Sequence, residues 1–387
     1  MSAQRIYLDH NATAPLLASA RQVMLSAIDL PGNASSVHAE GRAARAAIET
    51  ARASVATLLG VRPRDITFTS GGTEAANLVL SPSLSDGGKP LTRLFAAAGE
   101  HPCVLQGHRF APEFFAAVPL TGAGVLDLVG LKAMLDAAGG ERVLLALQVA
   151  NNETGVIQPI AEAAALVHLA GGLLVCDAVQ AAGRLPLAAL GADALFISAH
   201  KIGGPKGVGA LAFANVRLHM NGAALVKGGG QEKGLRAGTE NVAGIAGFGA
   251  AADVARLTLA EMDRLSALRD HLEVKVVGLL PDAVFFGQST ARLAQTSAFA
   301  VPGVSAETLL IALDLAGIAV SSGSACSSGK VQPSHVLRAM GAADELARGA
   351  LRVSLGPDNS ERDIEAFCEA LKNAVKNIRL RSDKNAA

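Results

Sequence analysis

Five short, predominantly apolar runs, each followed by a polar turn, constrain the fold of this 387-residue chain more than any other feature. They lie at residues 66–69, 94–98, 143–148, 173–177 and 194–198. Short runs that are apolar on both faces are typical of strands in a parallel sheet covered by helices on both sides. Because helical patterns separate them, we expect an α/β fold with a mostly parallel sheet. A ligand of such a sheet binds at the carboxyl ends of the strands.

Polar side chains follow these strands directly, so we expect them to meet in one crevice. A lysine there can bond an aldehyde, an aspartate can pair with a protonated pyridine nitrogen, a histidine can stack on the ring and an amide can bond a ring oxygen. Each residue alone is an ordinary helix cap or turn residue, but together they fit a pyridine-type ring cofactor. The set is Gly72, Thr73, His101, Asn152, Asp177, Gln180, Ser198, His200 and Lys201.

Lys201 is the candidate for the covalent link to a cofactor. It stands at the mouth of the strand at 194–198 and precedes a Gly-Gly-Pro turn whose glycines let the backbone approach a bound group. The alternative is a β-turn with a solvated lysine, and Lys206 could be that residue instead.

Two glycine-rich segments can bind an anion. Residues 70–77 follow a strand and open a helix, so exposed N–H groups, a threonine hydroxyl and the helix N-terminus favour a phosphate. Residues 228–241 form a second anion-capable loop, which includes Thr239. Upstream, we expect Ser35 or Ser36 to cap a long helix that runs to about Leu59.

The chain has four cysteines, and one of them is a candidate nucleophile. Cys326 lies in a stretch of almost only Ser, Gly and Ala at 321–330, where an exposed thiol usually has a reactive purpose, although it could be a linker cysteine without consequence. Cys176 lies within an apolar strand and should be buried, and no Cys-x-x-Cys pair indicates a zinc site. On the strand at 351–356, Arg352 would suit a planar anion such as a substrate carboxylate.

The charge balance excludes several classes of partner. Lys and Arg number 34, as do Asp and Glu, so the chain lacks the basic surplus of a nucleic-acid or anionic-membrane binder. We find no signal peptide and no apolar run long enough to span a bilayer. These features lead us to expect a cytoplasmic protein.

With these motifs in view, the chain resembles the NifS/IscS-like cysteine desulfurases, which are pyridoxal-phosphate (PLP) enzymes of aminotransferase class V. The resemblance covers nearly the full length. It is carried by residues 7–13, 70–74, 151–155, 177–180, 198–201, 236–241 and 322–327.

The resemblance implies a PLP-dependent transferase of fold type I. Residues 16–260 would form the large cofactor-binding domain, and residues 1–15 with 261–387 a small domain that carries the catalytic cysteine loop. The enzyme would remove sulfur from L-cysteine, release L-alanine and leave a persulfide on Cys326, which would supply iron–sulfur cluster assembly. It would be a homodimer that hands its sulfur to a scaffold or other acceptor protein.

The resemblance also implies a role for each site residue. Lys201 would bond the cofactor and act as a base, Asp177 would pair with the ring nitrogen, and His101 would stack on the ring and shuttle protons. The phosphate would be held by Gly72, Thr73, Ser198 and His200, with Thr239 from the partner subunit. Asn152 and Gln180 would contact the ring oxygen or substrate, and the substrate-binding residues would be Asn11, Asn152 and Arg352.

Three alternatives remain open. A selenocysteine lyase or another class V enzyme would use the same cofactor residues, but an aminotransferase has no use for Cys326. An inactive dimeric scaffold would need the loss of Lys201, Asp177 or Cys326, and all three are present. The C-terminal tail at 379–387 lacks the pattern of the housekeeping scaffold-binding enzymes, which leaves the sulfur acceptor undetermined.

Overall fold

The computed structural model describes residues 5–220, 224–323 and 332–386. Its centre is a seven-stranded sheet with the strand order β2-β10-β9-β8-β7-β5-β6. Only β10 runs antiparallel to its neighbours, so the prediction of a mostly parallel sheet is confirmed. The strands are β2 (Ile66–Thr69), β5 (Arg93–Ala97), β6 (Phe115–Val118), β7 (Val143–Gln148), β8 (Leu173–Asp177), β9 (Ala194–Ser198) and β10 (Gly209–Phe213).

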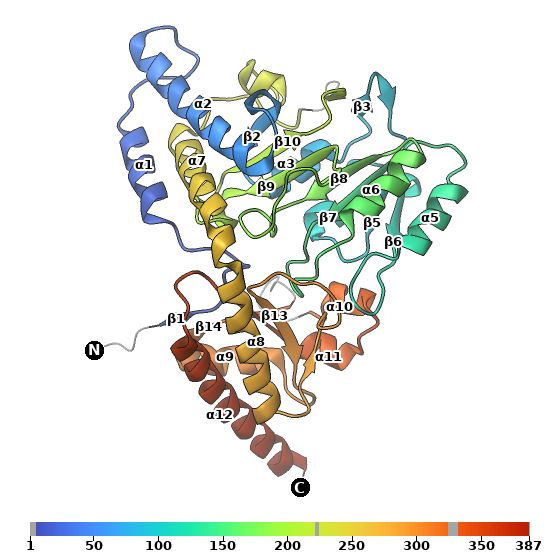
Figure 1. The fold of residues 1–387 in the computed structure, drawn as a ribbon, viewed down its shortest axis with the longest axis vertical. Helices are drawn as coiled ribbons and strands as arrows, with labels where there is room; N and C mark the ends of the chain where they lie inside the picture. The colour runs from blue at the N-terminus through green and yellow to red at the C-terminus, as the bar shows by residue number, and fades with distance from the viewer. Residues whose placement is uncertain (1–4, 221–223, 324–331, 387) are drawn as a thin grey trace.

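Helices cover both faces of this sheet, which explains why β7, β8 and β9 are buried along their whole length. One apolar core joins the sheet to α2 (Ala39–Leu59), α5 (Leu128–Ala137), α6 (Ile160–Leu169) and α7 (Val242–Leu257). The other core includes α3 (Gly72–Val79) and α4 (Pro102–Leu105). In Figure 1, α1 (Ala18–Ile28) and α2 lie beside α7 at the outer edge.

The expected cap of α2 is wrong. The helix begins at Ala39, and the His38 side chain accepts a hydrogen bond from Gly41 N. Ser35 and Ser36 instead complete a turn directed by Asn33: its side-chain oxygen accepts from Ser35 N and its carbonyl accepts from Ser36 N. The asparagine turn therefore takes the two serines out of capping position.

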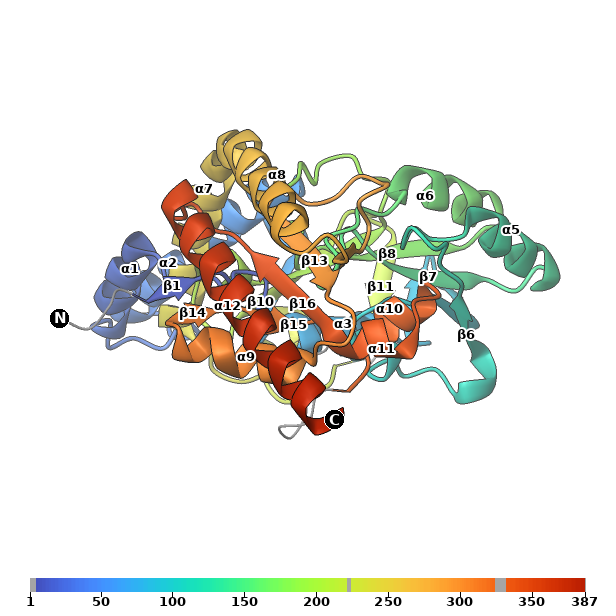
Figure 2. The same ribbon diagram turned by 90° about the horizontal axis from the view of Figure 1, so that it is seen from below.

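A second, four-stranded antiparallel sheet lies below the first in Figure 1, with the order β12-β13-β16-β15. Its strands are β12 (Val284–Phe285), β13 (Thr296–Ala300), β15 (Ser321–Ser322) and β16 (Ala350–Ser354). Its separate core joins β13 and β16 to α8 (Met262–Leu279), α9 (Ala306–Leu315) and α12 (Glu361–Ala386) (Figure 2). Two short helices, α10 (His335–Ala339) and α11 (Asp344–Gly349), pack at one side of this sheet.

The N-terminal segment crosses to this second part of the chain. Strand β1 (Ile6–Tyr7) pairs in parallel with β14 (Ile318–Ala319), and Leu8 belongs to the second core. Residues 9–12 are thereby held between the two sheets, at the carboxyl edge of the first. A small third sheet consists of β3 (Leu84–Asp86), β4 (Lys89–Pro90) and β11 (Leu218–Met220).

The helical stretch Val242–Leu279 joins the two parts. By length and composition alone it could cross a membrane, so the expectation that no apolar run is long enough to span a bilayer is wrong by that criterion. Half of its most apolar window is buried inside the fold, and α7 supplies Phe248 and several alanines to the main core. We therefore interpret it as a core helix followed by the helix that leads into the second sheet.

Candidate active site

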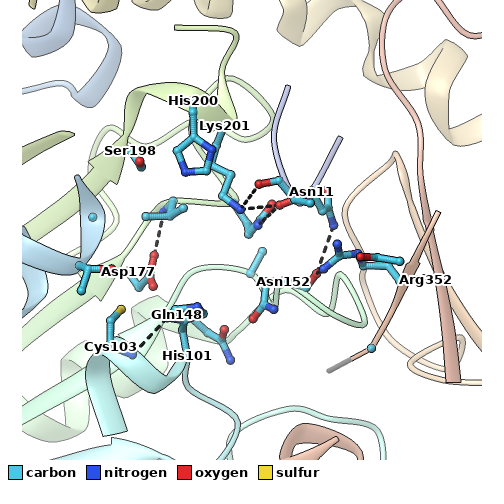
Figure 3. A pocket seen from close by; sticks show the side chains of 18 of the residues that line it. Asn11, His101, Cys103, Gln148, Asn152, Asp177, Ser198, His200, Lys201 and Arg352 are labelled. Carbon is cyan, nitrogen blue, oxygen red and sulfur yellow. Dashed lines mark hydrogen bonds between the residues drawn. The ribbon is translucent and has the colours of Figure 1, made fainter. Parts of the chain in front are cut away.

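A cavity of about 380 Å³ opens at the carboxyl edge of the main sheet, against residues of β16 and β15. The polar side chains that we expected to meet do meet there (Figure 3). The cavity brings together Asn11, Gly72, Thr73, His101, Asn152, Asp177, Gln180, Ser198, His200, Lys201 and Arg352.

The strand ends explain this convergence. Asp177 and Ser198 are the last residues of β8 and β9, and Lys201 closes a single helical turn directly after β9. His101 follows β5, and Asn152 follows β7. Since these strands are parallel, their carboxyl ends share one edge.

Lys201 lies at the centre of the cavity. Its Nζ donates hydrogen bonds to Asn11 O at 2.5 Å and to Ala12 O at 2.9 Å. Burial, and then the nearby guanidinium groups of Arg352 and Arg184, lower the pKa of Lys201 to about 7. Near neutral pH a large share of this lysine is therefore an uncharged amine, the form that attacks a carbonyl group.

Asp177 is a buried carboxyl group that has no cationic partner among the described residues. Its Oδ1 accepts from Val179 N at 2.8 Å, and within the described ranges no cationic side chain forms a hydrogen bond or ion pair with it. Burial raises the pKa of Asp177 to about 6. A protonated pyridine nitrogen would supply the missing positive charge, so this residue fits a pyridoxal ring.

His101 is held in one tautomer. Its Nδ1 accepts a hydrogen bond from Cys103 N at 3.1 Å, so the neutral ring carries its proton on Nε2. Burial, with Lys201 and His335 nearby, lowers the pKa of His101 to about 4. At neutral pH this side chain is therefore an uncharged donor.

The residues expected to bind an anion lie together at one end of the cavity. Gly72 and Thr73 begin α3, and they line the cavity together with Ser198 and His200. The same residues line a more open hollow with Lys206 and Gly207, so exposed Lys206 stands beside the expected phosphate position. Backbone N–H groups, hydroxyls and a lysine fit the phosphate of PLP.

Arg352 occupies the opposite end. Its Nη1 donates to Asn152 O at 2.9 Å and its Nη2 to Asp9 Oδ1 at 2.8 Å. Its buried Nε has no hydrogen-bond partner among the described residues. A planar guanidinium held by Asp9 with one donor unused suits a carboxylate ligand.

Both polar atoms of the Asn11 side chain already form hydrogen bonds with other residues of the chain. Its Nδ2 donates to Thr296 Oγ1 at 2.9 Å, and its Oδ1 accepts from Gln295 Nε2 at 3.2 Å. Its main-chain carbonyl instead faces Lys201 and Gln180. A substrate role for Asn11 therefore remains a prediction, and the group nearest the cavity is its carbonyl.

Some cavity residues were not predicted. Gln148 ends β7 and Cys103 follows His101 by two positions, so the rule that polar residues after strands line the site could have found both. Glu100 is buried behind the cavity lining and gave no signal, because it precedes His101 and looks like a surface charge in the sequence. Its Oε1 accepts from Gln148 N at 2.6 Å, and burial next to Asp177 raises its pKa well above the usual value.

Two predicted residues are not among the described residues that line this cavity. Thr239 is exposed and does not line the cavity of its own chain. Cys326 lies outside the described residues, although the described Ser321, Ser322 and Gly323 line the cavity. Cys176, expected to be buried, is inaccessible within β8.

The comparisons with known proteins agree with this geometry. Residues 6–367 match the model of the aminotransferase class-V family. The IscS-like cysteine desulfurase of Mycobacterium tuberculosis is 39% identical over 384 residues, which cover 96% of this chain and 97% of the relative.

Solved structures are similar over the same extent. The NifS-like protein of Rickettsia africae superposes with a TM-score of 0.86 and 36% identity, covering 96% of this chain and all of that one. A structure of SspA in complex with cysteine gives a TM-score of 0.73 and 27% identity, covering 92% and 100%.

A two-part α/β fold with a lysine, an aspartate and an anion cup at one sheet edge defines a PLP-dependent enzyme of fold type I. The chain belongs to the aminotransferase class-V family, in its group of NifS/IscS-like cysteine desulfurases.

Proposed function

We propose that this chain is a PLP-dependent cysteine desulfurase that converts L-cysteine into L-alanine and supplies the sulfur for iron–sulfur cluster assembly. The observation that carries the proposal is the single cavity that holds Lys201, Asp177, His101 and Arg352, in a chain whose relatives at about 40% identity are cysteine desulfurases. PLP, once bound, supplies an electron sink for bonds at the substrate Cα and Cβ.

The protein's own residues have distinct tasks. Asp177 keeps the ring nitrogen protonated, and the Gly72–Thr73 turn with Ser198 and His200 holds the phosphate. Arg352 binds the substrate carboxylate through its Nε, which has no partner among the described residues, and through Nη groups that exchange a present acceptor for the substrate. Lys201 Nζ, in the uncharged form that its lowered pKa of about 7 favours, takes the proton from the substrate Cα.

Sulfur transfer needs a nucleophile and a proton donor. The thiolate of Cys326 attacks the sulfur of the bound cysteine, so an S–S bond forms while the substrate Cβ–S bond breaks. The electron pair of the broken bond stays with Cβ, which ends as the methyl group of alanine after protonation. His101 Nε2–H is suited to deliver a proton during this sequence. The products, alanine and a persulfide on Cys326, contain every atom of the two reactants.

We further propose the assembly and its setting. Residues 16–260 form the cofactor-binding domain, and residues 1–15 with 261–387 form the small domain that carries Cys326. Two chains associate so that Thr239 of each reaches the phosphate of the other, because Thr239 is exposed and does not line the cavity of its own chain. The protein acts in the cytoplasm and passes its persulfide sulfur to a scaffold or other acceptor protein.

The decisive experiment incubates the purified protein with L-cysteine and measures alanine, and also sulfide after a reductant is added. Mass spectrometry should find one added sulfur on the peptide that contains Cys326. Cys326→Ser should still take up PLP and bind L-cysteine but release no alanine, whereas Cys368→Ser, which replaces a buried thiol in α12, is the matched control and should keep its rate. An adduct on Cys103, Cys176 or Cys368, or full activity of Cys326→Ser, would refute the mechanism.

A further inference from the structure

The guanidinium group of Arg184 links three segments of the cavity wall. Its Nη1 donates to Gln180 Oε1 at 2.6 Å and to Gln180 O at 3.0 Å, while Nη2 donates to Lys201 O at 3.3 Å. A longer bond of 3.5 Å joins Nη2 to His10 O. All of these acceptors are uncharged oxygens, and among the described residues no carboxylate pairs with this cation. Since Arg184 neutralises no described carboxylate, its role in this half-buried place must come from the oxygens to which it donates.

We infer that Arg184 is a positioning residue that fixes the Gln180 amide so that it presents an N–H group, and not its oxygen, to the cofactor ring. The two orientations of a glutamine amide have almost the same shape, so its neighbours select between them. Arginine offers only donors, and therefore the atom of Gln180 that faces Arg184 must be the oxygen.

The other end of the amide follows from this constraint. The Gln180 NH₂ group turns toward Asn11 O, to which Nε2 donates at 3.0 Å. That bond uses one of its two hydrogens. The second remains for the cavity, which Gln180 lines. Arg184 itself stays behind Gln180 and does not line this cavity.

The orientation of the amide has an electrostatic consequence at Lys201. A donor aimed at the ring oxygen of PLP stabilises its negative charge, whereas an amide oxygen would repel it. A ring oxygen stabilised in this way holds the proton of the Lys201–cofactor linkage less strongly. The correctly turned Gln180 therefore lowers the pH at which that proton is lost, and the positive charge of Arg184 acts in the same direction. The other charged or titratable groups that face Lys201 are Arg352, Asp177, Asp9, His101 and His200.

The test is a pH titration of the visible absorbance of the PLP-loaded protein, which does not depend on turnover. In Arg184→Met the midpoint should rise by about one pH unit, because the amide can turn over and the cation is gone. Arg184→Lys keeps a charged donor and should stay close to the wild type. The control is Arg142→Met, since Arg142 is also half-buried and donates to main-chain oxygens of Gly171 and Lys89 at the far edge of the sheet, where it additionally pairs with Asp86. An unshifted Arg184→Met midpoint, or an equal shift in the control, overturns the inference.

A double-mutant cycle tests whether Arg184 acts through Gln180. In a Gln180→Leu background, Arg184→Met should shift the midpoint by less than half as much as in the wild type. Fully additive shifts would assign the effect to the charge of Arg184 alone and overturn the positioning role.

A second variant decides the question if Arg184→Met does not fold. Gln180→Glu keeps an acceptor for Arg184 but has no N–H, so the midpoint must again rise, and an unchanged midpoint contradicts the inference. The inference rests on the cofactor assignment above, but the two fail differently. Protein that stays colourless with PLP refutes the assignment, whereas coloured protein with unshifted variants refutes only the role of Arg184.

Discussion

At the scale of single residues, the low pKa of Lys201 makes the uptake of PLP depend on pH. Its folded-state pKa of about 7 lies below the ordinary value, so the reactive neutral amine gains population as the pH rises toward 7 and predominates above it. The loading rate of apoprotein should rise nearly tenfold per pH unit below about pH 6 and level off above about pH 8.

Stopped-flow absorbance measures this rate. Lys201→Ala should never acquire the linked form, while Lys132→Ala removes an exposed lysine that pairs with Asp136 on α5 and should match the wild type. A loading rate that keeps rising to about pH 10 would mean that Lys201 has an ordinary pKa.

Asp177 should stabilise the loaded protein and destabilise the empty one. Burial raises its pKa to about 6 from 3.8, so the empty fold binds a proton more readily than the unfolded chain does. The resulting cost of holding a bare carboxylate is absent below about pH 4, develops as the pH rises to about 6, and amounts to roughly 3 kcal/mol at most above that.

Asp177→Asn should therefore raise the melting temperature of the apoprotein at about pH 8, and this gain should disappear near pH 4. The same variant should lose turnover by at least about a hundredfold, since a neutral amide cannot keep the ring nitrogen charged. Differential scanning calorimetry with and without PLP checks the melting temperatures, and alanine release from L-cysteine checks the turnover. If apo Asp177→Asn melts at a lower temperature than the apo wild type at pH 8, then Asp177 is not an unpaired buried carboxylate that destabilises the empty protein.

Single residues also show how far the sequence could lead. His101, Asp177 and Lys201 were found because each follows a strand, and topology alone brings such positions together. Glu100 and Arg184 were missed, since a charged residue reads as a surface residue until three-dimensional packing shows what covers it. The hydrogen bonds of the Asn11 side chain with Thr296 and Gln295 could not be predicted either, because these partners are more than 280 positions away in the sequence.

At the scale of elements, the loop that carries Thr239 is anchored by a buried ion pair. Arg52 of α2 donates to both carboxylate oxygens of Glu232, at 2.8 Å and 2.7 Å, and Glu232 Oε2 also accepts from Phe68 N at 2.9 Å. Glu232 and Lys233 have φ values of 46° and 57°, which non-glycine residues rarely adopt, so the ion pair holds a backbone that local preferences oppose.

Arg52→Met should destabilise the protein by about 3–5 kcal/mol, because it leaves the Glu232 carboxylate buried without its partner. The control is Arg62→Met, which breaks the more exposed pair with Asp65 and should cost less than about 1 kcal/mol. Urea denaturation of the apoproteins measures both. Equal losses of unfolding free energy in the two variants would show that the Arg52–Glu232 pair does not stabilise this loop more than an exposed pair does.

The elements that the sequence predicted well are those with a single dominant signal. Strands β2, β7, β8 and β9 match the expected ranges, because short apolar runs followed by polar turns define them. Helix α1 and the short strand β15 were missed. The outer side of α1 is exposed even at Leu25 and Ile28, so its apolar pattern marks no single face, and β15 exists only because it pairs with β16.

At the scale of the whole molecule, the site is incomplete within one chain if its phosphate is bound by the Thr239 side chain of a second copy. Thr239 is exposed, and its loop is fixed by Arg52 on the outer side of the sheet. A second copy could bring the same loop to this chain's anion cup, where Ser70, Lys206 and Gly207 line a hollow open to solvent. Twofold symmetry would then give two equal sites, each built from both chains.

Mixing two inactive variants tests this arrangement. If Thr239 acts in the partner's site, a mixed dimer of Lys201→Ala and Thr239→Ala chains has one site with an intact Lys201 and an intact Thr239, while its other site lacks both. Random reassembly should then restore about a quarter of the wild-type activity, since half of the dimers are mixed and each has one working site. If Thr239 acts within its own chain, every site lacks either Lys201 or Thr239, and mixing restores nothing. A protein that stays monomeric in light scattering at the assay concentration would exclude sharing altogether, and PLP uptake by that monomer would then show that the anion cup of a single chain suffices.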